Sequence, residues 1–390
     1  MSQNPRRAAT TLITTAATVS LLTAGVATAA AGPAWAAAHH PAFRARAILN
    51  GAALHHRFQK AGSKTWHTDK LSLPDDITAL GPAMFTAFQN GVGPQGQAAP
   101  DGNRDSTVVE FTPSGRPVRQ WDVRGKCDGL TADPLTGQVI ATVNEDAHSS
   151  VYTISPVTGQ VRHYHYSRPL PHQGGTDAIS IYHGQVLVSA SAPGTTGKAA
   201  PQPGYPAVYQ VAFHPASRIA HIRPVFYDEA KATVANTHGL DTVVRLGLTD
   251  PDSNEIVPPY ALRFRGDFML TSQGDKEQIF LRHTVRPALT VLRLSQSVDD
   301  TAWASGPGRV YTTDNAAGTV NVVTGPFRPG MVLVAVTPCD AGNAPATCPA
   351  PGFPANYLGA LNPWTGHISK LPVRGEALQP QGMLFAPAPH

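Results

Sequence analysis

A repeated unit of short strands and tight turns constrains the fold of this chain more than any other feature. The unit is clearest in residues 126–166, where the turn Asp133-Pro134-Leu135-Thr136-Gly137 separates two segments rich in β-branched and apolar residues. A second turn, Pro156-Val157-Thr158-Gly159, separates the next two segments. The pattern predicts a four-stranded antiparallel meander of about 40 residues. The expected strands are 128–132, 138–143, 151–155 and 160–166.

The opening strand of this unit recurs along the chain, each time headed by an acidic or amide residue. The copies begin at Asp76, Asp128, Asp177, Asn254 with Glu255, Asp300 and Gln381. Three of the intervals are about 50 residues long and two are about 80, because insertions at 192–205, 228–250 and 337–355 lengthen them. Six opening strands predict an all-β fold, a six-bladed β-propeller, with seven blades as the alternative.

The two ends of the chain are expected to share one blade. The last opening strand has no partner strands after it, and a hairpin at 54–71 has no opening strand before it. Joining them closes the ring and leaves no exposed sheet edge at the seam. We therefore expect 50–71 to supply the outer strands of this blade and 378–386 its inner ones. The propeller domain would be 51–390, with 37–50 as a lead-in segment.

The N-terminal residues 1–36 have the pattern of a secretory signal peptide. Arg6 and Arg7 supply the positive charge, a run of small and apolar residues follows, and Ala34-Trp35-Ala36 is a small-x-small cleavage site. Cleavage is expected after Ala36, with Ala29 or Ala30 as the alternative. The bulky apolar residues usual after a twin-arginine pair are absent, which favours the general secretory route. We expect a secreted, extracellular protein without a membrane span, since no later run reaches 18 apolar residues.

Composition agrees with a strand-and-turn fold and argues against nucleic-acid binding. The chain has 36 Pro and 35 Gly but only 14% charged residues, which is typical of many short strands. The net charge is +4 and no run of Lys or Arg exceeds two residues, so no basic footprint is present. Cys339 and Cys348 enclose a short loop and are predicted to form a disulfide in an exported protein. Cys127 is expected to be a buried thiol.

Two stretches resemble a known group of propeller repeats. They are CDGLTADPLTGQVIATVNED (127–146) and DDTAWASGPGRVYTTDNAAGTVNVVTG (299–325), which resemble the NHL, YVTN and gluconolactonase-like superfamily. The resemblance implies a propeller fold. In its gluconolactonase-like branch it also implies a divalent cation, held at the channel mouth by Glu, Asn and Asp from the starts of inner strands. The Glu-Gly-Pro and Asn-Gly elements of that branch are absent here. Because such propellers include hydrolases, lyases and binding modules, the resemblance specifies fold more than function.

The residues that head the opening strands form the candidate site. If these strands line a common channel, carboxylates and amides would ring its mouth and bind a ligand or a divalent cation such as Ca²⁺, which prefers oxygen ligands. A structural interpretation competes with this one, because Asp or Asn before a strand also caps a turn by accepting a bond from a backbone N–H. The candidate residues are Asp76, Asp128, Asp177, Asn254, Glu255, Asp300 and Gln381.

Histidines supply a second set of candidates. His163 and His165 would project from the same face of a strand, as a Zn or Cu pair would, although an outermost strand favours an exposed surface. His238 lies in an insertion and is a candidate general base if that loop overhangs the channel, with local turn structure as the alternative. The sequence contains no nucleophile elbow, zinc-protease motif, phosphate-binding loop or Cys-x-x-Cys.

These patterns predict an architecture more strongly than an activity. We expect a secreted ligand-binding or interaction module, monomeric, with a small molecule or an extracellular partner at the polar channel mouth. The first alternative is a metal-dependent hydrolase or lactonase, in which a cation held by Asp128, Asp177 and Asp300 polarises a carbonyl or activates water. The second alternative is a lyase of cyclic esters with His238 as its base.

Overall fold

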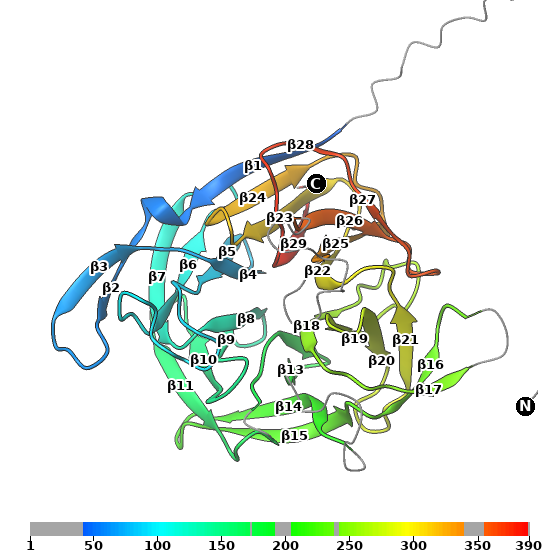
Figure 1. The fold of residues 1–390 in the computed structure, drawn as a ribbon, viewed down its shortest axis with the longest axis horizontal. Helices are drawn as coiled ribbons and strands as arrows, with labels where there is room; N and C mark the ends of the chain where they lie inside the picture. Colours follow the sequence, from blue (N-terminus) through cyan, green and yellow to red (C-terminus); the bar gives the residue numbers. More distant parts are fainter. Residues whose placement is uncertain (1–41, 172–173, 192–203, 238–241, 339–354, 389–390) are drawn as a thin grey trace, which may run out of the picture. The chain divides into compact units, whose positions relative to one another are not determined.

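The computed structural model describes residues 42–171, 174–191, 204–237, 242–338 and 355–388. Within these ranges the chain is almost entirely β-strand, which confirms the predicted all-β class. Most of the strands lie in sheets arranged around a central axis, in the manner of a β-propeller (Figure 1). No helix in these ranges has the length and hydropathy that a membrane span requires. The predicted signal peptide, His238 and the Cys339–Cys348 pair lie outside the described residues.

Two meanders follow the predicted repeat. The first consists of β4 (Pro74–Leu80), β5 (Ala83–Phe88), β6 (Asp105–Phe111) and β7 (Pro117–Arg124). The second consists of β8 (Cys127–Asp133), β9 (Gln138–Val143), β10 (Ser150–Ile154) and β11 (Val161–Tyr166). The second set confirms the four strands predicted within 126–166. Its turns contain Gly137 at φ 66° and Gly159 at φ 74°, a conformation that glycine adopts without a Cβ clash.

A third meander is joined to the second at their outer strands. It consists of β12 (Ile179–Tyr182), β13 (Gln185–Ser189), β14 (Pro206–His214) and β15 (Ile219–Tyr227). Strands β11 and β15 pair in parallel through His165 with Ile219 and Tyr166 with Ala220. The two meanders therefore form one eight-stranded sheet, and each protects the outer edge of the other along this contact.

The next sheet along the chain is extended outward by one of the predicted insertions. Its strands are β16 (Lys231–Val234), β17 (Val243–Arg245), β18 (Pro251–Ile256), β19 (Phe268–Ser272), β20 (Glu277–Leu281) and β21 (Leu289–Arg293). Their order is β17-β16-β21-β20-β19-β18, with β16 parallel to β21. The insertion at 228–250 thus supplies the two outermost strands.

In the last two sheets, strands that follow one another in sequence belong to different sheets. One consists of β22 (Val298–Trp303), β25 (Val332–Val336), β26 (Tyr357–Leu361) and β27 (Ile368–Lys370). The other consists of β29 (Met383–Pro387), β23 (Gly308–Asp314), β24 (Thr319–Thr324), β1 (Phe43–Asn50) and β28 (Val373–Gly375). Although 299–325 reads as one continuous repeat, its first strand, β22, therefore lies in a different sheet from β23 and β24.

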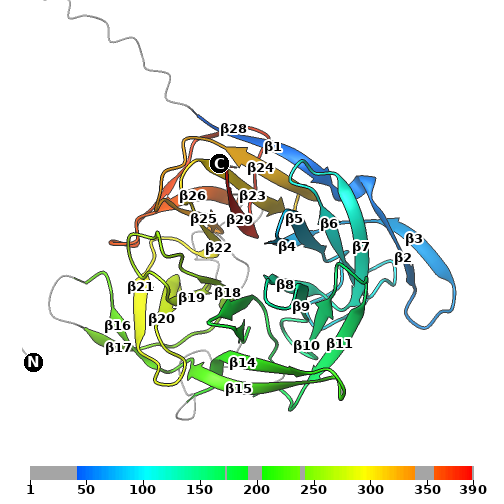
Figure 2. The same ribbon diagram turned by 180° about the vertical axis from the view of Figure 1, so that it is seen from behind.

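The first and last strands share a sheet, as predicted. The prediction that residues 50–71 supply the N-terminal strands of that sheet was wrong. Strand β1, in the predicted lead-in, pairs with β24 and β28. The hairpin predicted to close the ring instead forms a separate two-stranded sheet of β2 (His55–Gln59) and β3 (Trp66–Lys70), at the rim in both views (Figures 1 and 2). The reason is burial, since β1 places Phe43, Ala45 and Leu49 in the core whereas β3 has no buried residue.

The hydrophobic core lies between neighbouring sheets. Between the first two meanders, Phe85 and Trp121 pack with Leu130 and Tyr152. Cys127 belongs to the same cluster as a buried free thiol, as predicted. Full burial of one large apolar side chain contributes about 1.5–3 kcal/mol, so this packing holds the sheets and their inner strands in place around the axis.

Candidate functional site

Six inner strands surround a central cavity of about 740 Å³. They are β4, β8, β12, β18, β22 and β29, each of which contributes residues to the lining. The lining includes every strand-heading candidate predicted from the sequence, namely Asp76, Asp128, Asp177, Asn254, Glu255, Asp300 and Gln381. The structure therefore brings the candidates together, and ligand binding by them stays a prediction.

Four of the inner strands begin with a bulge, in which two residues lie opposite one residue of the neighbouring strand. Pairing with the neighbouring strand skips from Pro74 to Ile77 in β4, and the same gap occurs in β8, β18 and β22. The first bulged residue is an aspartate in each case. Asp177 and Gln381 hold the same position, two residues before the first paired residue of β12 and β29. We call this set the mouth ring: Asp75, Asp128, Asp177, Asp252, Asp299 and Gln381.

Three acids of the mouth ring, Asp75, Asp252 and Asp299, were missed by the sequence analysis. Their neighbours were chosen instead, because strand periodicity of two does not register an extra bulged residue. A signal was present in the sequence. Asp75 and Asp252 each follow a proline, and Asp299 follows a valine, at the point where the strand begins.

Hydroxyl groups from neighbouring sheets fix the backbone of the mouth ring. In each contact, a Ser or Thr on the second strand of one sheet donates to a mouth-ring carbonyl on the next inner strand. The pairs are Thr142 with Asp177, Ser189 with Asp252, and Thr313 with Asp75. Because these contacts tie each inner strand to its neighbour, the aspartates are held at equivalent places around the axis.

Lys126 is the one Lys, Arg or His among the described residues that line the cavity. Its Nζ lies 2.7 Å from Asp128 Oδ1 and also contacts Glu145 Oε1. Burial by itself would lower the pKa of Lys126, but attraction to Asp128, Glu145 and Asp75 outweighs it and raises the pKa. Lys126 is therefore a permanent ammonium group on one side of the mouth ring.

Burial and mutual repulsion raise the pKa values of four mouth-ring carboxyls. Burial is the largest cause for Asp75, Asp128, Asp177 and Asp252, and the charges of neighbouring acids add to it. The carboxyl groups of Asp177 and Asp252 also form a hydrogen bond with each other, which favours the charged form of Asp177 and the protonated form of Asp252. Contact between these two acids therefore moves their pKa values apart.

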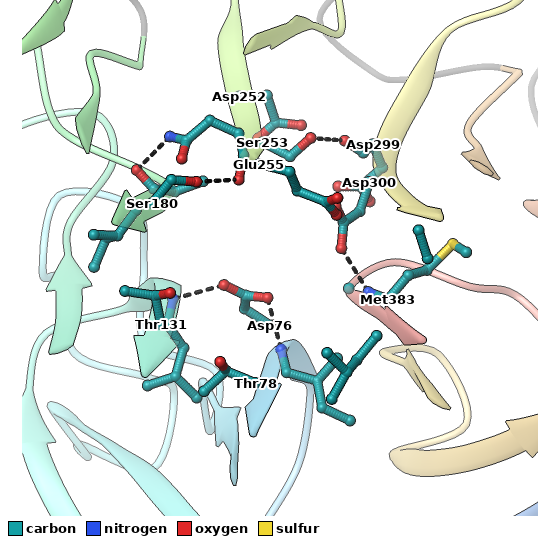
Figure 3. A pocket seen from close by; sticks show the side chains of 18 of the residues that line it. Asp76, Thr78, Thr131, Ser180, Asp252, Ser253, Glu255, Asp299, Asp300 and Met383 are labelled. Atoms are coloured by element: carbon teal, nitrogen blue, oxygen red, sulfur yellow. Dashed lines mark hydrogen bonds between the residues drawn. The ribbon is translucent and has the colours of Figure 1, made fainter. Parts of the chain in front are cut away.

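Three further acids, Asp76, Glu255 and Asp300, lie beyond the mouth ring along the inner strands, and we call them the inner trio (Figure 3). Burial, then repulsion by Asp300, raises the pKa of Glu255 well above its ordinary value. Burial raises the pKa of Asp300 to about 6, a smaller rise because two backbone N–H groups stabilise its charge. Interaction between the carboxyl groups of Glu255 and Asp300 raises the pKa of Glu255 and lowers that of Asp300.

Asp76 and Asp300 accept hydrogen bonds from backbone N–H groups, which is the structural role expected as the alternative to ligand binding. The two oxygens of Asp76 accept bonds from the N–H groups of Ile77 and Leu130, both at 2.6 Å. Asp300 accepts from Thr301 at 2.6 Å and from Met383 at 2.5 Å (Figure 3). Each carboxylate thus joins its own inner strand to the next one.

Several polar oxygens in the cavity wall have no hydrogen-bond partner among the described residues. They are Asp128 Oδ2, Asn254 Oδ1 and Gln381 Oε1. Asp128 and Asn254 are only 4% and 5% exposed. Because an unpaired buried acceptor costs about 1–3 kcal/mol, these positions favour a ligand that donates hydrogen bonds.

A preformed site for a metal ion is absent from the described residues. No three His, Cys, Asp or Glu side chains among them are placed to hold one ion together. The mouth ring places its acids on separate strands, as the resemblance implies, and Lys126 occupies one side of it. A divalent cation held by these residues stays a prediction.

The His163–His165 pair lies on β11, away from the cavity lining. Their ring centroids are 4.4 Å apart, and His163 Nε2 bonds to Ser150 Oγ at 2.8 Å. The His163 ring also stacks on Tyr152. Burial, with the charge of His165, lowers the pKa of His163 to about 4. These contacts explain the pair as part of an outer strand surface rather than of the candidate site.

Stability is expected to fall as pH rises from about 4 towards neutrality. An acid whose pKa is raised by folding binds protons more tightly in the native state, so the free energy of unfolding decreases between the two pKa values. For Asp300 this window runs from 3.8 to about 6, and the other raised acids widen it upward. Urea unfolding at a series of pH values measures the slope. Glu255→Gln should flatten it, whereas stability that rises across this window would contradict the buried-acid arrangement.

Comparisons with known proteins show distant likenesses of fold. No protein-family model matches the chain, and no curated protein sequence matches it. Among solved structures, the periplasmic gluconolactonase of Pseudomonas aeruginosa has a TM-score of 0.45 at 14% identity, covering 90% of this chain and 99% of that one. A streptogramin B lyase has a TM-score of 0.40 at 12% identity, covering 85% and 91%. Hydrazine synthase of Kuenenia stuttgartiensis has a TM-score of 0.40 at 15% identity, covering 77% and 66%.

Proposed function

We propose that this protein is a secreted six-bladed β-propeller that binds a small cationic ligand in its central cavity. Six inner strands that present equivalent positions to one axis support the blade number. The N-terminal pattern of residues 1–36 supports export. On this proposal the propeller is a binding module, and its specificity comes from the charge and hydrogen-bonding groups of the cavity wall.

The observation that carries the proposal is the imbalance of charge in the cavity. Nine acidic residues and one basic residue, all described, line it. Even with raised pKa values, the wall presents several carboxylates in a partly water-excluded space, where a cation is attracted and an anion is repelled. The unpartnered oxygens of Asp128 and Asn254 add acceptors for the N–H groups of such a ligand.

The proposal can be tested with three probes of one shape and different charge. Pentylamine is expected to bind, and pentanol and pentanoate are expected to bind at least about tenfold more weakly, a difference of about 1.4 kcal/mol. Asp128→Asn should weaken pentylamine binding in isothermal titration calorimetry. Glu376→Gln, an exposed site outside the cavity lining, is the matched control.

Two outcomes would reject the cationic-ligand proposal. Equal binding of pentanoate and pentylamine would show that charge does not select the ligand. Tight binding of Ca²⁺ with no binding of amines would return the metal-dependent hydrolase or lactonase alternative to first place. The lyase alternative depends on His238, which lies outside the described residues.

A further inference from the structure

The acids of the cavity form two groups that interact mainly within themselves. In the mouth ring, Asp75 is influenced by Lys126, Asp299 and Asp177. In the inner trio, Asp76 is repelled chiefly by Asp300, and Glu255 by Asp300 and then Asp76. The cavity therefore has two places where negative charge gathers.

The negative charges of the two groups differ in how far cationic side chains of the protein offset them. Lys126 lies within the mouth ring, bonded to Asp128 and Glu145. No Lys, Arg or His in the described part of the chain is among the main influences on the pKa values of the inner trio. A cation from outside is therefore needed most at the inner trio, with a second position on the side of the mouth ring away from Lys126.

Strand β18 fixes the spacing between these two positions. Asp252 belongs to the mouth ring and Glu255 to the inner trio, three residues further along the same strand. At a rise of roughly 3.3 Å per residue, and less across the bulge, the two groups are at most about 10 Å apart. Between them, Asn254 Oδ1 is buried and has no partner among the described residues.

We propose that the ligand is an aliphatic diamine, with one ammonium group bound by the mouth ring and the other by the inner trio. This inference rests on the proposed function and names its ligand class. The first ammonium would lie near Asp177 and Asp252, and the second between Glu255 and Asp300. Figure 3 shows Asp252, Glu255 and Asp300 at the cavity wall. A chain of about four to six carbons spans the gap set by β18. Each ammonium group has three N–H donors, which match the carboxylate and amide oxygens of the wall.

The test compares ligands of one length on the full mature protein. The probes are 1,5-diaminopentane, its mono-N-acetyl derivative and pentylamine, measured by calorimetry. The diamine is expected to bind at least about tenfold more tightly than either monocation, because the second contact is intramolecular once the first has formed. This arm needs no variant, so it does not depend on whether a substitution folds.

A variant locates the second ammonium group. Glu255→Gln should remove most of the diamine's affinity advantage over pentylamine, because pentylamine can use the mouth position when the inner position is weakened. Glu376→Gln should change neither affinity. The thermal transition of each variant checks that it is folded.

The outcomes separate this inference from the proposed function. If the diamine and both monocations bind equally, the diamine assignment is wrong and the cationic-ligand proposal stands. If the diamine binds more tightly but Glu255→Gln weakens every probe alike, the two-position model is wrong. If no amine binds, the proposed function fails and the diamine inference fails with it.

Discussion

Lys126→Met is expected to reduce the free energy of unfolding by about 3 kcal/mol at neutral pH, because it removes one partner of a buried charge group and leaves the others uncompensated. The lysine side chain is 18% exposed and that of Asp128 only 2%. Attraction to Lys126 is also what partly offsets the raised pKa values of Asp128 and Asp75. Urea unfolding of the wild type and the variant measures the loss.

The loss should shrink near pH 4, where protonated Asp128 and Asp75 no longer need the lysine charge. Lys70→Met, an exposed change on β3, is the control and should alter stability by less than about 0.5 kcal/mol. The same Lys126→Met variant should bind pentylamine more tightly, since the resident ammonium is gone. A variant as stable as the wild type at neutral pH would show that the acids around Lys126 are already neutral.

Asp76→Ala is expected to destabilise the fold by about 2–4 kcal/mol, because it leaves two buried N–H groups without an acceptor. These groups belong to Ile77, on the same strand, and to Leu130, on the next inner strand. Both residues are under 5% exposed, so water cannot easily replace the carboxylate. The measurement is again the free energy of unfolding in urea.

Asp69→Ala provides the comparison, since Asp69 is exposed and accepts only from the adjacent Lys70 N–H. It should cost less than about 0.5 kcal/mol. A more stable Asp76→Ala protein would mean that relief of repulsion with Asp300 exceeds the value of the two hydrogen bonds. The competition matters for function, because the cavity keeps its acids only if the contacts between inner strands hold them together.

The local pattern of the chain was sufficient to predict strands and turns. The meander from β8 to β11 matches the prediction to within one or two residues, because its turns carry Gly137 and Gly159 where positive φ is required. The acid- or amide-headed strands were also placed correctly as the lining of one cavity. These features depend on neighbours in sequence.

Features that depend on contacts between distant segments could not be predicted from the local sequence pattern. Strand β22 pairs with β25, not with β23, although the sequence between β22 and β23 resembles an ordinary hairpin. Likewise β1 reaches its sheet by pairing with β24, a strand far away from it in the sequence. Each choice depends on which pairing buries more apolar surface, which a local pattern does not contain.

By itself, the sequence determined that this chain is made of short antiparallel strands headed by acids and amides, because turn residues and alternating side chains act over a few positions. Only the tertiary structure decided which acids face one another. A single extra residue in each bulge brought Asp75, Asp252 and Asp299 to the mouth ring, and packing between sheets placed Glu255 beside Asp300. The reason is that charge, pKa values and ligand choice depend on distances across the cavity, which are set by the closure of the whole ring of sheets.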